Sequence, residues 1–136
     1  MRRLSFPAAL LCALLLLTAC APDSRTAELT LDGKAPEAVT LQPDSDDPLR
    51  LRVTWDGETL LDLPFGQAHE ISVQTPGGGE NRIRMTGQSA FMESANCENQ
   101  DCVHMGEVNY DNWEMRVMGG FIVCLPHKVS VEVYGD

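Results

Sequence analysis

Three cysteines and two histidines in the last third of the chain are the residues whose chemistry could define a site. They fall within 31 residues, in the segments CENQDCVHMG and CLPHK: Cys97, Cys102, His104, Cys124 and His127. Two thiols can close a disulfide, whereas thiolates and imidazoles together are ligands for zinc, copper and iron–sulfur clusters. The segment therefore allows a cross-linked loop, a metal site or a redox centre, and the rest of the chain must decide between them.

The N-terminus predicts the compartment in which these side chains work. Arg2 and Arg3 form a short basic segment, and every residue from Ala8 to Leu17 is apolar. This apolar run is too short to span a bilayer as a permanent helix, so residues 1–19 are predicted to be a secretory signal peptide. Its strong hydrophobicity favours export of the unfolded chain over the twin-arginine route.

The signal peptide ends in the sequence LTAC, which resembles the lipobox of bacterial lipoproteins. The resemblance implies cleavage before Cys20 and lipidation of that cysteine, and the acyl chains would anchor a soluble domain to a membrane. Ala21 follows rather than aspartate, so the expected location is the outer membrane where a cell has two, facing the periplasm. The chain is thus predicted to be a lipid-anchored protein of the cell envelope.

The mature chain from residue 20 is short and strongly acidic. It has 117 residues, enough for one domain, and its eight basic residues face twenty acidic ones, a net charge of −12. A charge of this size repels phosphate backbones, so we predict no nucleic-acid partner. The predicted partners are the membrane, through Cys20, and other envelope proteins.

Only three cysteines are left to act inside the mature domain. Cys12 is removed with the signal peptide and Cys20 is used by the lipid, which leaves Cys97, Cys102 and Cys124. In an oxidising compartment one disulfide is the default expectation. Three thiols can pair in three ways and always leave one over, so the sequence does not fix the connectivity.

The elements that must position these residues are short β-strands. Apolar and polar residues alternate in 49–55 and 129–133, and Asp56-Gly57 is a two-residue hairpin signal. The run 119–126 is continuously apolar and is predicted to be a central strand. Turn signals recur every eight to twelve residues and no useful helical period occurs, so we predict an all-β fold, a small sandwich or barrel of short antiparallel strands.

The predicted domain occupies residues 49–136. Residues 20–48 are predicted to be the lipidated N-terminus, a small polar tether and an acidic linker that has a proline at each end, PDSDDP. A domain of this size has a small core, so a disulfide that contributes about 2–4 kcal/mol would matter to its stability.

The order of the motifs resembles the NusG domain II family, a small β domain that is inserted in some NusG transcription factors and also occurs alone in exported proteins. The matching segments, between roughly residues 49 and 133, are RVTWDGETLLDLP, ISVQTPGGGENRIRM, ESANCENQDCVHMG and FIVCLPHKVSVEV. One departure is the segment 107–120, which is longer than the usual link and begins with Glu107 in place of a tryptophan. The resemblance implies a β domain and little about activity.

The cysteines and histidines allow several kinds of site. Thiol–disulfide exchange is disfavoured because Cys-x4-Cys lacks the tight Cys-x-x-Cys spacing. The sequence leaves three other kinds open. The first is a structural disulfide without metal. The second is a zinc or copper site, because Cys97-x4-Cys102-x-His104 and Cys124-x2-His127 offer five suitable ligands. The third is a [2Fe-2S] cluster, since Cys-x-His with Cys-x-x-His resembles the Rieske pattern. Lys128 stands where Rieske domains usually have glycine, and unfolded export disfavours a cluster loaded in the cytoplasm.

We predict a non-enzymatic protein. The sequence contains no Gly-x-Ser-x-Gly, no His-Glu-x-x-His and no phosphate loop, so no catalytic residue is assigned. The expected function is that of an envelope-anchored binding or accessory module with a cysteine-stapled loop and no cofactor. The alternative is a metal-binding or Rieske-like electron-transfer protein that uses the same cysteines and histidines.

Overall fold

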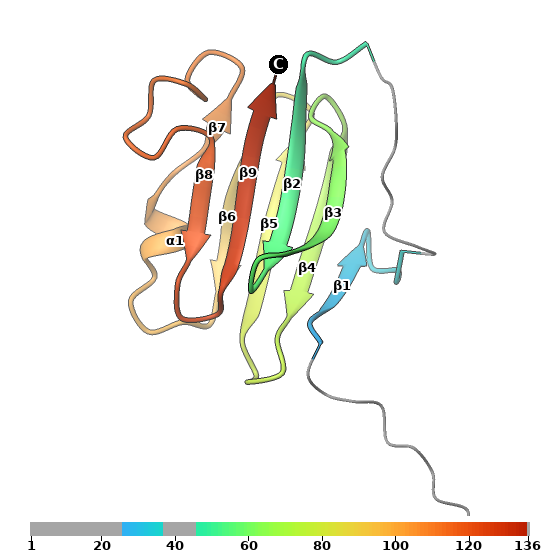
Figure 1. Ribbon diagram of the computed structural model, residues 1–136, viewed down its shortest axis with the longest axis vertical. Helices are drawn as coiled ribbons and strands as arrows, with labels where there is room; N and C mark the ends of the chain where they lie inside the picture. Colours follow the sequence, from blue (N-terminus) through green and yellow to red (C-terminus); the bar gives the residue numbers. More distant parts are fainter. Residues whose placement is uncertain (1–25, 37–45, 136) are drawn as a thin grey trace, which may run out of the picture.

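The computed structural model describes residues 26–36 and 46–135, and these form a sandwich of two antiparallel sheets (Figure 1). The predicted signal peptide and Cys20 lie outside the described residues. The first sheet has the order β1 (Glu28–Leu31), β4 (Ala68–Gln74), β5 (Glu80–Thr86), β6 (Ser89–Ala95) and β7 (Val108–Asn109). The second has the order β3 (Glu58–Pro64), β2 (Leu49–Trp55), β9 (Val129–Gly135) and β8 (Phe121–Cys124). The predicted all-β sandwich is confirmed.

One short helix, α1 (Asp101–His104), is the exception to the β structure of the described part of the chain. It lies between the end of β6 and the edge strand β8, and it packs against both. Across the ranges 26–36 and 46–135, none of the helical structure has the length and apolar character that a membrane span requires.

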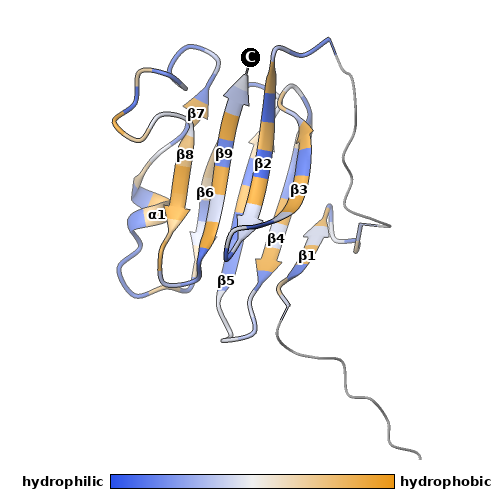
Figure 2. Cartoon of the chain, in the orientation of Figure 1, coloured by the Kyte–Doolittle hydropathy of each residue, from blue (hydrophilic) through white to orange (hydrophobic). Residues whose placement is uncertain are grey.

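Alternating side chains make the two faces of each sheet different. In β2, Leu49, Leu51 and Val53 are buried between the sheets, while Arg50 and Arg52 lie on the outer face. The banding of apolar and polar residues along β2 and β9 is visible in Figure 2. Burial of one face of each strand is what period-two alternation predicts, and it fixes the register because a one-residue slip would expose the whole apolar set.

The predicted hairpin between β2 and β3 is confirmed. Asp56 and Gly57 adopt φ values of 48° and 86°, the left-handed conformations that a type I′ turn requires at both central positions. Asp56 N–H donates to the Lys128 carbonyl oxygen at 2.9 Å, so the hairpin also touches the turn between β8 and β9.

The prediction that the apolar run 119–126 forms a central strand is wrong. β8 pairs with β9 on one side alone and is an edge of the second sheet. Its outer edge is covered: the Val123 N–H donates to Met105 Sδ at 3.3 Å, and Arg116 Nη1 donates to the Phe121 carbonyl oxygen at 3.1 Å. Within the run, Ile122 and Cys124 are buried in the core, whereas Phe121 and Leu125 are 39% and 78% exposed. Covering the edge of β8 in this way limits pairing with other chains.

The sandwich also draws on residues that the sequence predicted to be tether and linker. β1 pairs antiparallel with β4, and Asp32 Oδ1 accepts a hydrogen bond from the Glu70 N–H at 2.9 Å. Asp47, in the acidic segment, accepts from the N–H groups of Leu49 and Gly66 and from the Tyr110 hydroxyl. The weak alternation of the short strand explains why its pairing was not visible in the sequence.

Candidate functional site

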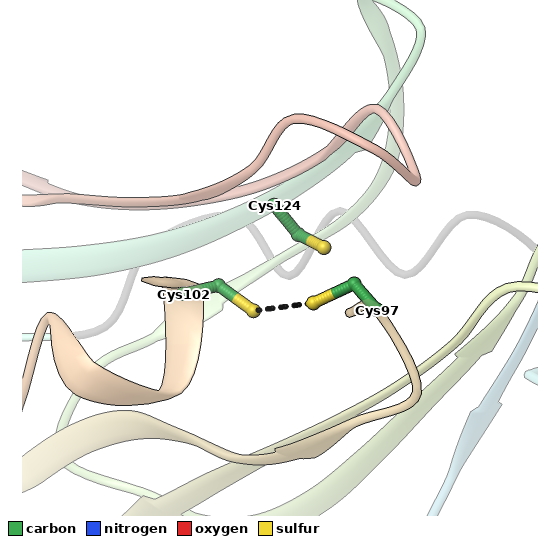
Figure 3. Close-up of side chains that lie close together, drawn as sticks. All are labelled: Cys97, Cys102 and Cys124. Carbon is green, nitrogen blue, oxygen red and sulfur yellow. Dashed lines mark hydrogen bonds between the residues drawn. The ribbon is translucent and has the colours of Figure 1, made fainter. Parts of the chain in front are cut away.

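Three cysteine side chains from separate parts of the chain converge between the two sheets. Cys97 follows β6, Cys102 lies in α1 and Cys124 is the last residue of β8. Their Sγ atoms all lie within 4.8 Å of one another, and the Cys97–Cys102 pair is 3.8 Å apart (Figure 3). All three side chains are buried. We call this group the cysteine cluster.

Hydrogen bonds to the backbone hold the loop that carries two of these cysteines. Gln100 adopts a left-handed φ of 55°, and its side-chain Nε2 donates to the carbonyl oxygens of Ala95 and Cys97 at 2.7 and 2.6 Å. The amide thus bridges the end of β6 and the start of α1. The segment 96–106, the cysteine loop below, is fixed by this clamp as well as by its buried sulfurs.

The surroundings of the cluster keep its central thiol neutral. Burial, together with the neighbouring Cys124 and Cys97, raises the pKa of Cys102 to about 12. Desolvation penalises a thiolate that has no cation beside it. Cys102 is therefore a protonated thiol at neutral pH and lacks the lowered pKa of a reactive cysteine.

The two predicted histidines do not join the cysteine cluster. Among the described residues, the group of ligand atoms within 4.8 Å of one another consists of Cys97, Cys102 and Cys124. His104 is exposed on α1. A Rieske cluster needs two histidine nitrogens on its second iron, and here His104 is exposed while His127 bonds to Asn81.

His127 has a structural partner instead. Its Nδ1 lies 2.7 Å from Oδ1 of Asn81, a side chain that is 1% exposed and whose Nδ2 contacts Met92 Sδ at 3.5 Å. Because Oδ1 can only accept, Nδ1 of His127 carries the proton. The imidazole packs on Gly79, where an added Cβ would lie 2.6 Å from ring atom Cδ2. His127 thus ties the β8–β9 turn to the hairpin of β4 and β5.

The match to a known family covers nearly the whole chain: residues 9–136 fit the family model described as NusG domain II. The chain belongs to the NusG domain II family. The family resemblance inferred from the cysteine motifs is thereby confirmed. No functionally curated protein matches the chain.

Several solved structures are similar to this chain. The Lin0431 protein of Listeria innocua is 24% identical, with a TM-score of 0.56, over 65% of this chain and 98% of that one. A DUF1312 family protein of Enterococcus faecalis is 19% identical, with a TM-score of 0.55, over 65% and 98%. A DUF1312 family protein of Ruminococcus gnavus is 31% identical, with a TM-score of 0.48, over 64% and 99%. The first two likenesses describe a fold and assign no activity.

Segment 107–120 contains a positioning residue that the sequence did not indicate. Arg116 donates from Nη2 to the Met105 carbonyl oxygen at 2.7 Å and from Nη1 to the carbonyl oxygens of Gly119 and Phe121 at 3.0 and 3.1 Å. It joins the end of the cysteine loop to β8. Its one available signal is that it is the sole basic residue of segment 107–120.

A surface depression lies beside the cysteine cluster. Cys97, 6% exposed, is the cluster residue that reaches it. The lining residues come from the cysteine loop and from the β8–β9 turn: Asn96, Cys97, Glu98, Asn99, Pro126 and His127. Sequence spacing placed the cysteines together, whereas Asn81 and Gln100 became visible only through contacts that the fold creates.

Proposed function

We propose that this protein is a membrane-anchored lipoprotein of the cell envelope whose NusG domain II acts as a non-enzymatic binding or accessory module. The observation that carries the proposal is the cysteine loop. Gln100 and Arg116 hold this surface segment near its two ends, and its two buried cysteines hold it on the side that faces the core. A rigid scaffold that presents a fixed loop is the usual arrangement of a binding surface. The signal peptide and the lipobox-like LTAC sequence support the anchor at Cys20.

The parts of the cysteine loop that face solvent are polar. Glu98, Asn99, Asp101 and His104 are exposed, while Cys97 and Cys102 hold the loop from its buried side. The depression between the loop and the β8–β9 turn adds a concave edge. This surface suits recognition of a polar partner in the envelope, because its hydrogen-bonding groups are presented without the entropy cost of ordering a mobile loop.

The cysteine cluster provides the support for this surface. In an oxidising compartment Cys97 and Cys102, with sulfurs 3.8 Å apart, could form a disulfide, which requires the sulfurs to approach to about 2.05 Å. That bond would close a short loop without linking the two sheets. The loop is held in either oxidation state, because Gln100 and Arg116 bond its backbone carbonyls independently of the sulfurs.

The anchor is tested by expressing the full chain in bacteria that incorporate a labelled fatty acid. The wild-type protein should carry the label and sediment with membranes, and the Cys20→Ala variant should carry none. An unlabelled wild-type protein would contradict the lipoprotein assignment.

The binding surface is tested by placing a photo-crosslinking residue at Asn99, in the exposed part of the cysteine loop. The matched control position is Gln88, which is also exposed but precedes β6, whereas the loop follows that strand. We expect a discrete cross-linked product from position 99 and none from position 88. Equal products from both positions, or none from either, would remove the loop as the binding surface.

A further inference from the structure

A disulfide leaves one member of the cysteine cluster unexplained. Whichever two sulfurs pair, the third remains as a buried thiol within 4.8 Å of both. The three side chains come from three backbone segments and point toward a common centre (Figure 3). A site that uses all three sulfurs at once accounts for this convergence, and a single staple does not.

The sulfur separations match those around one bound ion. Two thiolates that each lie about 2.3 Å from one metal ion are about 3.8 Å apart in tetrahedral geometry and about 4.0 Å apart in trigonal geometry. The Cys97–Cys102 separation is 3.8 Å, and no pair in the cluster exceeds 4.8 Å. Side-chain rotations that move the sulfur atoms by a fraction of an ångström would therefore bring all three into contact with an ion at the centre.

We propose that Cys97, Cys102 and Cys124 bind one soft, low-coordinate metal ion of the Cu(I) class through three thiolates. This inference rests on the proposed function, because it assigns a ligand to the cluster that supports the cysteine loop. Binding releases the thiol protons to solvent and forms three sulfur–metal bonds with no change in the oxidation state of the ion.

The donor set decides the class of ion. Structural zinc sites are closed by four protein ligands, whereas the described residues supply three sulfurs within 4.8 Å of one another and no fourth donor of the usual kinds. Soft thiolates in an apolar site select Cu(I) over harder ions. Gln100 Nε2 lies 3.9 Å from Cys97 Sγ, so an amide N–H already faces one of the ligand atoms from outside the cluster.

A bound ion would also join the two sheets. Cys97 and Cys102 belong to the loop that extends the first sheet, and Cys124 ends β8 of the second. The ion would link them through one centre, whereas the Cys97–Cys102 disulfide would not. Metal binding should therefore stabilise the whole domain rather than the loop alone.

The test is a Cu(I) titration of the full lipidated chain, purified in detergent and reduced without oxygen, in competition with a chromophoric Cu(I) chelator. We expect one Cu(I) per chain by native mass spectrometry and X-ray absorption from three sulfur neighbours at about 2.3 Å. Cys124→Ser should weaken binding at least a hundredfold. His104→Ala and His127→Asn, the matched controls, should bind as the wild type does.

Several outcomes would overturn the metal site. They are no retained copper, a site that prefers Zn(II) with four ligands, or dependence of binding on His127. The X-ray absorption measurement uses the wild type, so it decides the matter even if Cys124→Ser does not fold. Failure here, with lipid labelling and the position 99 cross-link intact, would leave the proposed function standing. Loss of the label or cross-link with copper still bound would remove that function alone.

Discussion

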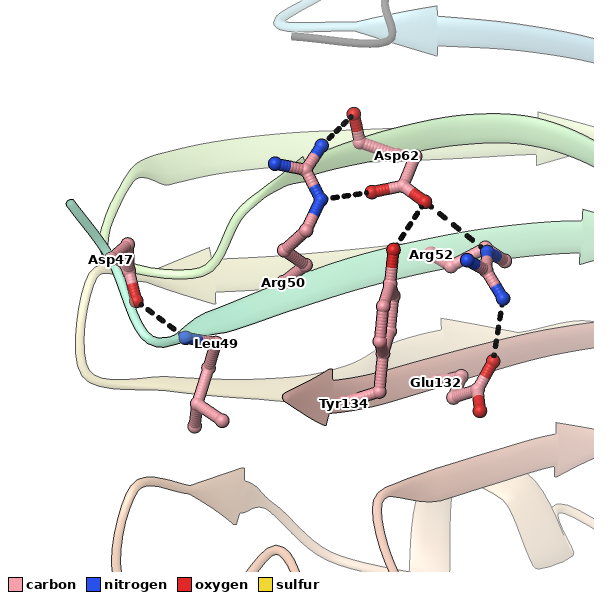
Figure 4. Close-up of polar contacts among 7 residues, drawn as sticks. All are labelled: Asp47, Leu49, Arg50, Arg52, Asp62, Glu132 and Tyr134. Atoms are coloured by element: carbon pink, nitrogen blue, oxygen red, sulfur yellow. Dashed lines mark hydrogen bonds and ion pairs between the residues drawn. The ribbon is translucent and has the colours of Figure 1, made fainter. Parts of the chain in front are cut away.

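Two groups of buried or half-buried polar side chains in this protein differ in how fully their bonding capacity is used. On the outer face of the second sheet, the Asp62 carboxylate is 5% exposed and accepts from Arg50 Nε at 2.7 Å, Arg52 Nε at 3.2 Å and the Tyr134 hydroxyl at 2.7 Å (Figure 4). The Arg52 guanidinium also lies over the Tyr134 ring, 4.4 Å from its centroid.

The cysteine cluster has no comparable partners. Cys97 and Cys102 have sulfurs 3.8 Å apart, and a thiol is a weak donor and a weak acceptor. The Asp62 network stabilises the fold because each charge is matched. The three thiols of the cluster form only weak contacts, so they could still form a disulfide or bind a ligand. The comparison therefore favours a structural role for the Asp62 network and a role in bond formation or ligand binding for the cysteine cluster.

The largest change in the free energy of unfolding should come from Cu(I) binding to the cysteine cluster. If Cu(I) binds the native state alone, free ion at a thousand times its dissociation constant adds about 4 kcal/mol to the free energy of unfolding. Chemical denaturation of the reduced protein with and without Cu(I) measures this difference. An unchanged unfolding midpoint would remove the contrast between the two groups.

The next largest change in stability should come from removing the charge of Asp62. Asp62→Asn keeps the shape but removes the charge that Arg50 and Arg52 face, so we expect a loss of about 2 kcal/mol in the free energy of unfolding. Glu93→Gln is the matched control, because Glu93 pairs with Arg84 at an exposed site and should change stability by less than about 0.5 kcal/mol. Urea denaturation decides the point, and equal losses would deny the network its special role.

The same carboxylate should make stability depend on pH. Burial opposes ionisation of Asp62, but hydrogen bonds from Tyr134 and Arg50 outweigh it and hold the pKa below its ordinary value. A lowered pKa contributes stability that is fully present above the unfolded value of about 3.9 and is lost as pH falls through the folded value. The difference between wild type and Asp62→Asn should therefore be constant from pH 7 to 5 and shrink below pH 4. A difference that grows on acidification would contradict this account.

A smaller effect is expected at Arg116, which joins the cysteine loop to β8. Arg116→Ala removes three hydrogen bonds to backbone carbonyls and uncovers the edge of that strand, so we expect a loss of about 1.5 kcal/mol. Arg116→Lys should recover part of it, since one ammonium cannot reach all three acceptors. Hydrogen exchange at the Phe121 and Val123 amides should rise in Arg116→Ala, and unchanged protection would show that the loop does not depend on this side chain.

What the sequence could predict follows from the distance between partners along the chain. The alternation in β2 and β9 and the Asp56-Gly57 turn are local patterns, and they gave the strands and the hairpin correctly. The partner of His127 is Asn81, 46 residues away, so local spacing left metal ligation open as an alternative and could not show the hydrogen bond that the fold provides. The edge position of β8 was missed because a run of apolar residues does not show which of them are buried: Ile122 and Cys124 face the core, whereas Phe121 and Leu125 are exposed.

The smallest change in stability should come from Gln100→Ala. It tests whether the cysteine loop is held by the Gln100 amide as well as by its sulfurs. Gln100→Ala removes the amide that bridges Ala95 and Cys97, and should cost about 1 kcal/mol in the free energy of unfolding. Gln88→Ala, at an exposed turn, is the matched control with no expected change. Because a three-sulfur site needs its ligands held in place, Gln100→Ala should also weaken Cu(I) binding severalfold without changing its stoichiometry. Full affinity in this variant would mean that the sulfurs alone fix the loop, and the amide would then belong with the Asp62 network as a purely stabilising group.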